Sequence, residues 1–259
     1  MSLPIRILDT DLRSARWNVA MTAALVERHA SALGQDTVRF HRYAASVLIG
    51  RSQDVGRVAD VDYCQRAGIE IARRVTGGGA VFMSPRMLAW EVLTDRGALG
   101  ADLEAATRRI CEGVAAGLSR LGVSARFRGP NDIEVGGRKV SGSSGYIDGR
   151  SAVLQGTVLI TDDLPEMARA LRISETVLRQ RLSCLTAAVG RALPIADVAD
   201  SVLRGLMRAL DRTAAMAQPS AAEIAAAEAL LREEIGTEEF VTGIGTAHLA
   251  EDAAWHAGS

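Results

Sequence analysis

The sequence predicts a single α+β domain with a mixed, largely antiparallel sheet flanked by helices. Strand-like and helix-like segments alternate along the 259 residues without an internal repeat. In residues 132–160 the strand-like runs follow one another across short glycine-rich turns, too closely spaced for a continuous parallel barrel. From residue 164 onward the chain is alanine-rich and helical in pattern. We therefore treat residues 1–259 as one domain, with a helical C-terminal segment from about residue 193.

The N-terminal third predicts a helix, a pair of strands and a second helix. Residues 14–30 form a helix because apolar side chains recur on one face, which should lie against a sheet: Trp17, Met21, Ala24 and Leu25. The run 37–50 divides into two short strands. Residues 61–67 are helical and end at Gly68, which suits the left-handed residue after a helix.

The middle of the chain alternates strands with glycine-rich turns. Residues 69–95 contain strands interrupted by three consecutive glycines at 77–79. A long amphipathic helix follows over 102–122, with Asp102 as its N-cap and a glycine after its end. Gly136-Gly137 then predicts a hairpin between two strands.

Composition narrows the class of protein. The net charge of −1 and the pI near 6.4 provide no global basic field, so neither nucleic acid nor an anionic membrane is expected as a main partner. The three cysteines, Cys64, Cys111 and Cys184, are odd in number and lack CxxC spacing, which argues against a disulfide framework or a zinc knuckle. With no apolar run near the length of a membrane span and no signal-like start, we expect a cytoplasmic protein.

Lys139 is the only lysine in a chain that has 29 arginines. A single surface lysine could be an accident of composition. Lysine differs from arginine, however, where a compact charge on a flexible stem must approach one atom. The residues around Lys139 therefore decide between the two interpretations.

Two glycine-rich stretches contain further residues that could form a ligand-binding site. "RRVTGGGAV" (73–81) lacks the spacing of the known phosphate-loop and dinucleotide motifs, yet its glycines allow a ligand close to the backbone; a flexible hairpin is the alternative. Arg73 and Arg74 face opposite sides of a strand, so at most one enters such a site. In "GPNDIEVGGRKVSGSS" (129–144), Asn131-Asp132 form either an Asx turn or a carboxylate site for Mg²⁺ beside a phosphate.

These stretches, followed in order by "LQGTVLI" (154–160) and "RLSCLT" (181–186), resemble the catalytic domain of the lipoate–protein ligase A family. The resemblance implies a fold like that of the biotin and lipoyl ligases. It also implies that ATP, Mg²⁺ and lipoate form a lipoyl-adenylate, from which the lipoyl or octanoyl group passes to a lysine of an acceptor. The implied acceptors are lipoyl-domain proteins, such as the acyltransferase subunit of a 2-oxoacid dehydrogenase or the glycine-cleavage H protein.

The resemblance also implies roles for individual residues. Lys139 matches the family lysine that contacts the activated acyl group and is the implied catalytic residue; Asp132 is the implied metal ligand. The implied lipoyl- and acyl-AMP-binding residues are Arg74, Gly77, Gly78, Gly79, Ala80, Val81, Asn131, Asp132, Ser141, Gly142, Gly156 and Thr157. For the apolar tunnel that the lipoyl chain needs, the candidates are Val75, Val81, Leu88 and Val153.

The chain departs from the family pattern at two motifs. Met83-Ser84 stands where the ligases have His-Asp, and Leu154-Gln155 stands where they have His-His. We expect this chain to lack the accessory domain that follows the catalytic domain in full-length ligases. The resemblance is therefore to the short, split form, in which a separate accessory subunit assists adenylation.

Two rival functions stay open at this point. Octanoyltransferases of the same superfamily use a cysteine nucleophile and no ATP, but the loop that carries it in some of them reads "RFRGPND" here, without cysteine. A non-catalytic lipoyl-binding module is the second rival. The retained lysine argues against it, because ligand sensing alone requires no ammonium at the acyl carbon.

Overall fold

The computed structural model describes residues 4–99 and 102–243. Its strands are β1 (Ile5–Arg13), β2 (Thr37–Tyr43), β3 (Ser46–Ile49), β4 (Glu70–Arg73), β5 (Val81–Met83), β6 (Leu88–Asp95), β7 (Ala125–Arg128), β8 (Asp132–Val135), β9 (Arg138–Asp148), β10 (Ser151–Val158) and β11 (Ala214–Ala217). Its helices are α1 (Ala15–Ala30), α2 (Val55–Val58), α3 (Val61–Ala67), α4 (Arg96–Leu99), α5 (Leu103–Ser119), α6 (Leu164–Ala170), α7 (Glu175–Arg181), α8 (Leu185–Val189), α9 (Ile195–Leu210), α10 (Ala221–Leu230), the π-helix η1 (Leu231–Ile235) and α11 (Glu238–Thr242).

The strands form two sheets. The large sheet has the order β11-β1-β2-β6-β10-β9-β8-β7, in which β1 runs parallel to both of its neighbours and the other pairs are antiparallel. A small sheet has the order β4-β3-β5. The predicted mixed, largely antiparallel sheet flanked by helices is thus confirmed.

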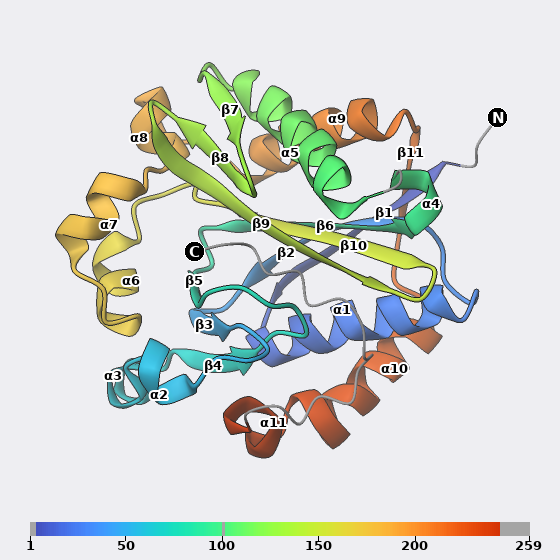
Figure 1. The fold of residues 1–259 in the computed structure, drawn as a ribbon, viewed down its shortest axis with the longest axis horizontal. Helices are drawn as coiled ribbons and strands as arrows, with labels where there is room; N and C mark the ends of the chain where they lie inside the picture. Colours follow the sequence, from blue (N-terminus) through green and yellow to red (C-terminus); the bar gives the residue numbers. More distant parts are fainter. Residues whose placement is uncertain (1–3, 100–101, 244–259) are drawn as a thin grey trace.

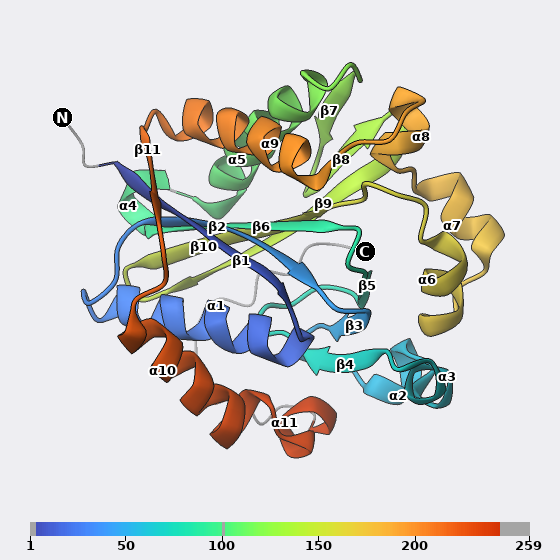
Figure 2. The same ribbon diagram turned by 180° about the vertical axis from the view of Figure 1, so that it is seen from behind.

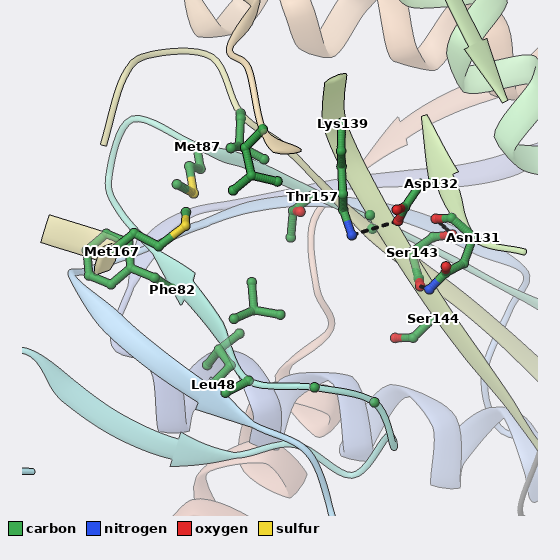
Figure 3. Close-up of a pocket in the computed structure, with 18 of the residues that line it drawn as sticks. Leu48, Phe82, Met87, Asn131, Asp132, Lys139, Ser143, Ser144, Thr157 and Met167 are labelled. Atoms are coloured by element: carbon green, nitrogen blue, oxygen red, sulfur yellow. Dashed lines mark hydrogen bonds and ion pairs between the residues drawn. The ribbon is translucent and has the colours of Figure 1, made fainter. Parts of the chain in front are cut away.

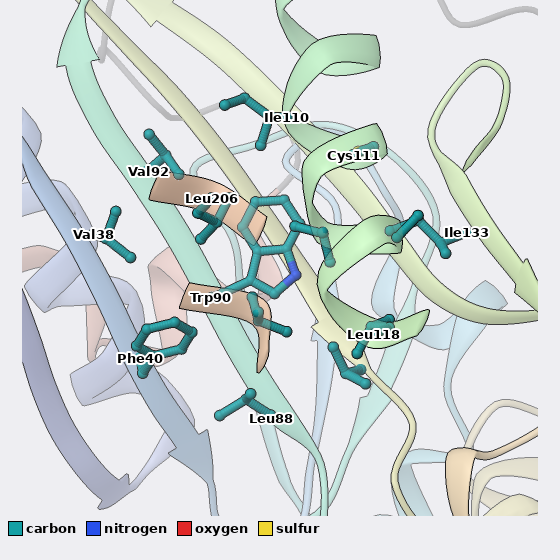
Figure 4. Packing of buried hydrophobic residues seen from close by; sticks show 14 of the residues in the cluster. Val38, Phe40, Leu88, Trp90, Val92, Ile110, Cys111, Leu118, Ile133 and Leu206 are labelled. Atoms are coloured by element: carbon teal, nitrogen blue, oxygen red, sulfur yellow. The ribbon is translucent and has the colours of Figure 1, made fainter. Parts of the chain in front are cut away.

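Helices cover both faces of the large sheet (Figures 1 and 2). On one face α5 and α9 pack over a core in which Trp90 is surrounded by aliphatic side chains of the sheet and of both helices (Figure 4). On the other face lie α1 and α10, packed on residues such as Leu93 and Val153. Within residues 4–99 and 102–243, no helix has the length and apolar character that a bilayer span requires.

Several local predictions are confirmed. Asp102 caps α5 by accepting a hydrogen bond from the backbone N–H of Ala105. Gly68 ends α3 with a φ of 66°. Gly136 and Gly137 both have positive φ, 59° and 76°, as a tight two-residue hairpin requires, and they connect β8 to β9.

The C-terminal quarter is not wholly helical, contrary to the expectation for residues 193–259. Ala214–Ala217 form β11, one of the two edge strands of the large sheet, which pairs in parallel with the first four residues of β1. Residues 244–259 of that predicted segment lie outside the described residues.

Arg73, the last residue of β4, ties α11 to the turn that follows β3. Its buried guanidinium donates hydrogen bonds to the backbone carbonyls of Phe240 and Val241 and to those of Gly50, Arg51 and Gln53, at 2.8–3.1 Å. Burial lowers the pKa of this arginine. Arg73 is therefore a structural cation, as expected for one member of the Arg73-Arg74 pair.

Candidate functional site

A cavity of about 580 Å³ opens between the small sheet, the ends of β8–β10 and the helices α6 and α7. It is lined by all but one of the residues that the sequence motifs nominated: Arg74, Gly77, Gly78, Gly79, Ala80, Val81, Asn131, Asp132, Lys139, Gly142, Gly156 and Thr157. The exception is Ser141, which is buried within β9 and is not part of the lining.

Lys139 stands at the centre of this cavity (Figure 3). It lies three residues after the start of the Gly136-Gly137 turn and is paired with Glu134, and the β8–β9 register shifts immediately beyond that pair, between Glu134 and Ile133. Its Nζ is 2.6 Å from Asp132 Oδ1, and the Lys139 side chain is 34% exposed. Gly142 leaves room for it, because a Cβ at that position would lie 2.6 Å from Nζ. The ammonium is thus held by one carboxylate and is open to the cavity.

The glycine loop between β4 and β5 is shaped by Arg74. The buried Arg74 guanidinium donates to the carbonyls of Leu48, Gly77 and Gly79 at 2.8–3.0 Å. Gly78 adopts a φ of 95°, a conformation that favours glycine. Burial lowers the pKa of Arg74 to about 10. Glycines 77–79 are exposed, so a braced loop presents its backbone to the cavity.

Gln155 fastens the glycine loop to the large sheet. Its Nε2 donates to Thr76 Oγ1 at 2.9 Å and lies 3.4 Å from Ser144 Oγ. Gln155 occupies the place of the second histidine in the family motif. This amide joins the residue just before the glycines to β9 and β10.

Two reciprocal hydrogen bonds between Asn131 and Ser143 fix the start of β8. Asn131 Nδ2 donates to the carbonyl of Ser143 at 2.8 Å, and the Ser143 hydroxyl donates to the carbonyl of Asn131 at 2.9 Å. These bonds orient Asp132, the next residue, toward Lys139. The alternative of a plain Asx turn is not what the structure shows, because the Asn131 side chain bridges two strands.

The opposite end of the cavity is apolar. Leu48, Phe82, Met87 and Met167 gather there, away from the polar group of Asn131, Asp132, Ser143 and Ser144, with the Lys139 amine between (Figure 3). Helices α6 and α7 and the segments flanking them complete the apolar wall with Leu171, Ile173, Val177, Leu178 and Leu182.

The sequence-based choice of tunnel residues was mostly wrong. Val81 lines the cavity, but Leu88 and Val153 belong to the two core layers on either face of the large sheet. Val75 packs against the cluster beneath α1 and η1. The actual wall is built largely from methionines and leucines of strands, loops and helices that have the spacing of ordinary core residues, so no pattern in the sequence distinguishes them.

Ser84, where the ligases have an aspartate, also has a structural partner. Its hydroxyl donates to the buried Asp163 at 2.7 Å, and Arg86 pairs with the other oxygen of that carboxylate. This contact fixes the chain after β5 against the start of α6. It therefore supports the apolar wall rather than adding a polar group to the cavity.

The three cysteines are buried, and none lines the cavity. Burial raises the pKa of Cys64 and of Cys111 to about 11. Cys111 Sγ contacts the hydroxyl of Ser143, and Cys184 Sγ contacts that of Thr186. No cysteine thus has the exposed, electropositive setting of a reactive thiolate.

The described residues contain no group of three or more His, Cys, Asp or Glu side chains arranged to hold a metal ion. Asp132 is the carboxylate nearest to Lys139. Mg²⁺ is commonly held by one or two carboxylates together with substrate phosphates, and the residues present fit that arrangement rather than an all-protein cage.

Comparison with known proteins identifies the family whose members have this arrangement of motifs. The family model described as "Lipoyl protein ligase A/B catalytic domain" matches residues 14–207. The Lipoate-protein ligase A subunit 1 of Thermoplasma acidophilum is 29% identical over 188 residues, 68% of this chain and 71% of that one. Octanoyltransferase LipM of Symbiobacterium thermophilum is 27% identical over 266 residues, 91% and 97% of the two chains.

Coverage differs among relatives. A protein of Aeropyrum pernix is 34% identical over 169 residues, but the match spans only 62% of its length. Among solved structures, a lipoate-protein ligase A bound with ATP superposes with a TM-score of 0.85 at 25% identity, covering 93% of this chain and all of that one. Protein Ta0514 of T. acidophilum with bound lipoic acid has a TM-score of 0.83 at 25% identity, covering 93% and 99%.

The match over residues 14–207 takes in the glycine loop, the Lys139 hairpin and strands β9 and β10. The fold, with its mixed sheet, agrees with that of the solved lipoate–protein ligases. The chain belongs to the lipoyl protein ligase A/B catalytic domain family.

Proposed function

We propose that this protein is an ATP-dependent lipoate–protein ligase, which joins a lipoyl or octanoyl group to a lysine of a lipoyl-domain protein through an acyl-adenylate. The observation that carries the proposal is the position of Lys139, whose amine lies between an apolar wall and a polar end of one cavity (Figure 3). An amphipathic acyl-adenylate has the same sequence of parts: an apolar chain, a carbonyl and a phosphate.

In the first step, an oxygen of the acyl carboxylate attacks the α-phosphorus of ATP and pyrophosphate leaves. Two anions must approach each other, so a compact cation between them lowers the barrier. The Lys139 ammonium is such a cation. Its present partner, Asp132, holds it in place at 2.6 Å until the anions arrive.

In the second step, the ε-amine of the acceptor lysine attacks the acyl carbonyl, an amide bond forms and AMP leaves. Negative charge develops on the carbonyl oxygen as the bond forms, and a positioned ammonium stabilises it. The glycine loop, braced by Arg74 and Gln155, is the element we assign to the nucleotide, because its exposed backbone lets a ligand approach closely.

Mg²⁺ would be held by Asp132 together with the phosphates. The metal would shield the negative charge of the phosphates, and Asp132 would then be shared between the metal and Lys139. The fit rests on Asp132, one of the two carboxylates that line the cavity, and the metal dependence stays a prediction. Relatives with bound ATP and bound lipoic acid support the choice of small-molecule substrates.

A second candidate is acyl transfer from a carrier protein without ATP. It is favoured by the match to octanoyltransferase LipM, which extends over 91% of this chain. A covalent thioester route, however, needs a cysteine that reaches the substrate, and all three thiols are buried and absent from the cavity lining. The chemistry of the cavity therefore favours the ligase.

The deciding experiment incubates the full chain with a lipoyl domain and records the intact mass of that domain. The ligase proposal expects a lipoyl mass increase that requires ATP and lipoate. A mass increase from octanoyl carrier protein without ATP would support the transferase instead. Binding of lipoate without modification of the domain would identify a non-catalytic module.

A further inference from the structure

The sheet face that continues from the cavity to the edge strand β7 carries two exposed arginines. Phe127 of β7 and Ile133 of β8 pack toward α5 in the core, so the alternate residues Arg126 and Arg128 point to the other face. Arg128 is directly opposite Asp132 in the β7–β8 pairing, and Arg126 is opposite Glu134.

Those two carboxylates also line the cavity, so the arginines adjoin its mouth. Asp132 is paired with Lys139. Within residues 4–99 and 102–243, no ion pair joins Arg126 or Arg128 to a carboxylate. Arg126, Arg128 and Lys139 are three cations beside two carboxylates, so this side of the cavity keeps a local excess of positive charge on a chain whose net charge is −1.

The far side of the mouth is formed by α7 and the residues before it. Ile173 and Val177 line the cavity there and are 40% and 41% exposed. Arg181, one helical turn after Val177, is also exposed and lines the cavity. We call Arg126, Arg128 and Arg181 the arginine rim.

We propose that the arginine rim is the docking surface for the acceptor, a protein domain that carries acidic side chains beside the lysine to be modified. This rests on the proposed function. Charge complementarity selects the partner: Arg181 lines the cavity on α7, and Arg126 and Arg128 on β7 lie opposite two lining carboxylates, so a lysine that enters from this side meets an excess of positive charge. The arginine rim repels a lysine that has no acidic neighbours. Carboxylates beside the lysine make the net interaction of that protein domain with the rim attractive.

The test compares Arg126→Glu/Arg128→Glu with a control, Arg204→Glu/Arg208→Glu, whose exposed arginines lie on α9 over the opposite face of the sheet. Binding of an apo lipoyl domain is measured by fluorescence anisotropy at low and at high salt. The same domain with its lysine-flanking Asp and Glu changed to Asn and Gln is the second probe. Transfer of the acyl group from lipoyl-AMP to hydroxylamine measures the rate of acyl transfer in the absence of the lipoyl domain.

The Arg126→Glu/Arg128→Glu protein, called the rim variant, reverses two of the three rim charges; it should bind the domain at least about tenfold more weakly at low salt and lose most of the salt dependence, as expected when electrostatic steering is removed. The control should bind like wild type, and transfer to hydroxylamine should be unchanged in both. Neutralising the acidic residues of the domain should weaken wild-type binding and leave the rim variant little affected.

Wild-type affinity and salt dependence in the folded rim variant would overturn the inference. So would a loss of transfer to hydroxylamine, because the arginines would then serve the small ligand. If the domain binds in a rim-dependent way but receives no acyl group under any condition, the proposed function fails and the docking surface stands.

Discussion

Replacing Gly142 with alanine should impair catalysis while sparing the fold. A Cβ at this position would lie 2.6 Å from Lys139 Nζ and 2.7 Å from Cε, whereas ordinary contacts are 3.4–4 Å. Gly142 lies in a strand and is not among the glycines with positive φ, so alanine fits the backbone. The end of the lysine must therefore move, by about 1 Å, and a misplacement of this size can lower a rate by roughly a hundredfold.

The assay is single-turnover transfer from synthetic lipoyl-AMP to a lipoyl domain, with thermal melting as the test of folding. We expect a rate about a hundredfold below wild type with little change in melting temperature, because the displaced group is the free end of a flexible side chain. Gly56→Ala, where a Cβ would meet only Asp54 Oδ1 at 3.5 Å, is the matched control. A wild-type rate in folded Gly142→Ala would show that the position of the Lys139 amine does not matter.

Three further outcomes follow from the geometry. Lys139→Arg should lose roughly a hundred- to a thousandfold in transfer rate, nearly as much as Lys139→Ala, because a planar guanidinium cannot take the place of the compact ammonium; near-normal transfer would count against the assigned role. Gly78→Val should abolish nucleotide binding by calorimetry, since valine is strained at a φ of 95°; normal binding by the folded variant would remove the glycine loop from the site. The Asp36 carboxylate accepts a hydrogen bond from His29 and also pairs with Arg212, which together lower its pKa to about 2. Its contribution of about 2 kcal/mol should be complete above about pH 5 and be lost as the pH falls toward 2. Urea unfolding of Asp36→Asn should lack this acid-dependent loss, and an identical pH profile in both proteins would contradict the assignment.

The parts of the structure that were predictable from the sequence are those set by local conformation. Gly136-Gly137, Asp102 and Gly68 each impose a backbone geometry through their own side chain or lack of one, so their turns and caps could be identified residue by residue. The quoted motifs also named most of the cavity lining, because their ordered resemblance to one family places them together.

The parts that could not be predicted depend on distant contacts. Ala214–Ala217 have the composition of a helix, and they form a strand only because the exposed edge of β1 offers hydrogen bonds. The apolar wall comes from Met87, Met167 and their neighbours, which have no periodicity distinct from core. The role of Arg74 could not be predicted either, because only the folded loop shows that its guanidinium donates its hydrogen bonds to backbone carbonyls.

The contact between Arg73 and α11 sets a limit on how this protein can be shortened. Phe240 and Val241 supply carbonyl acceptors to the guanidinium of Arg73, a residue that is only 2% exposed. A chain cut before Phe240 would leave N–H donors unsatisfied in the interior, at about 1–3 kcal/mol or more for a charged group. The last described helix is therefore part of the folded core around β4, and truncations that remove Phe240 and Val241 should lower the stability of the whole domain.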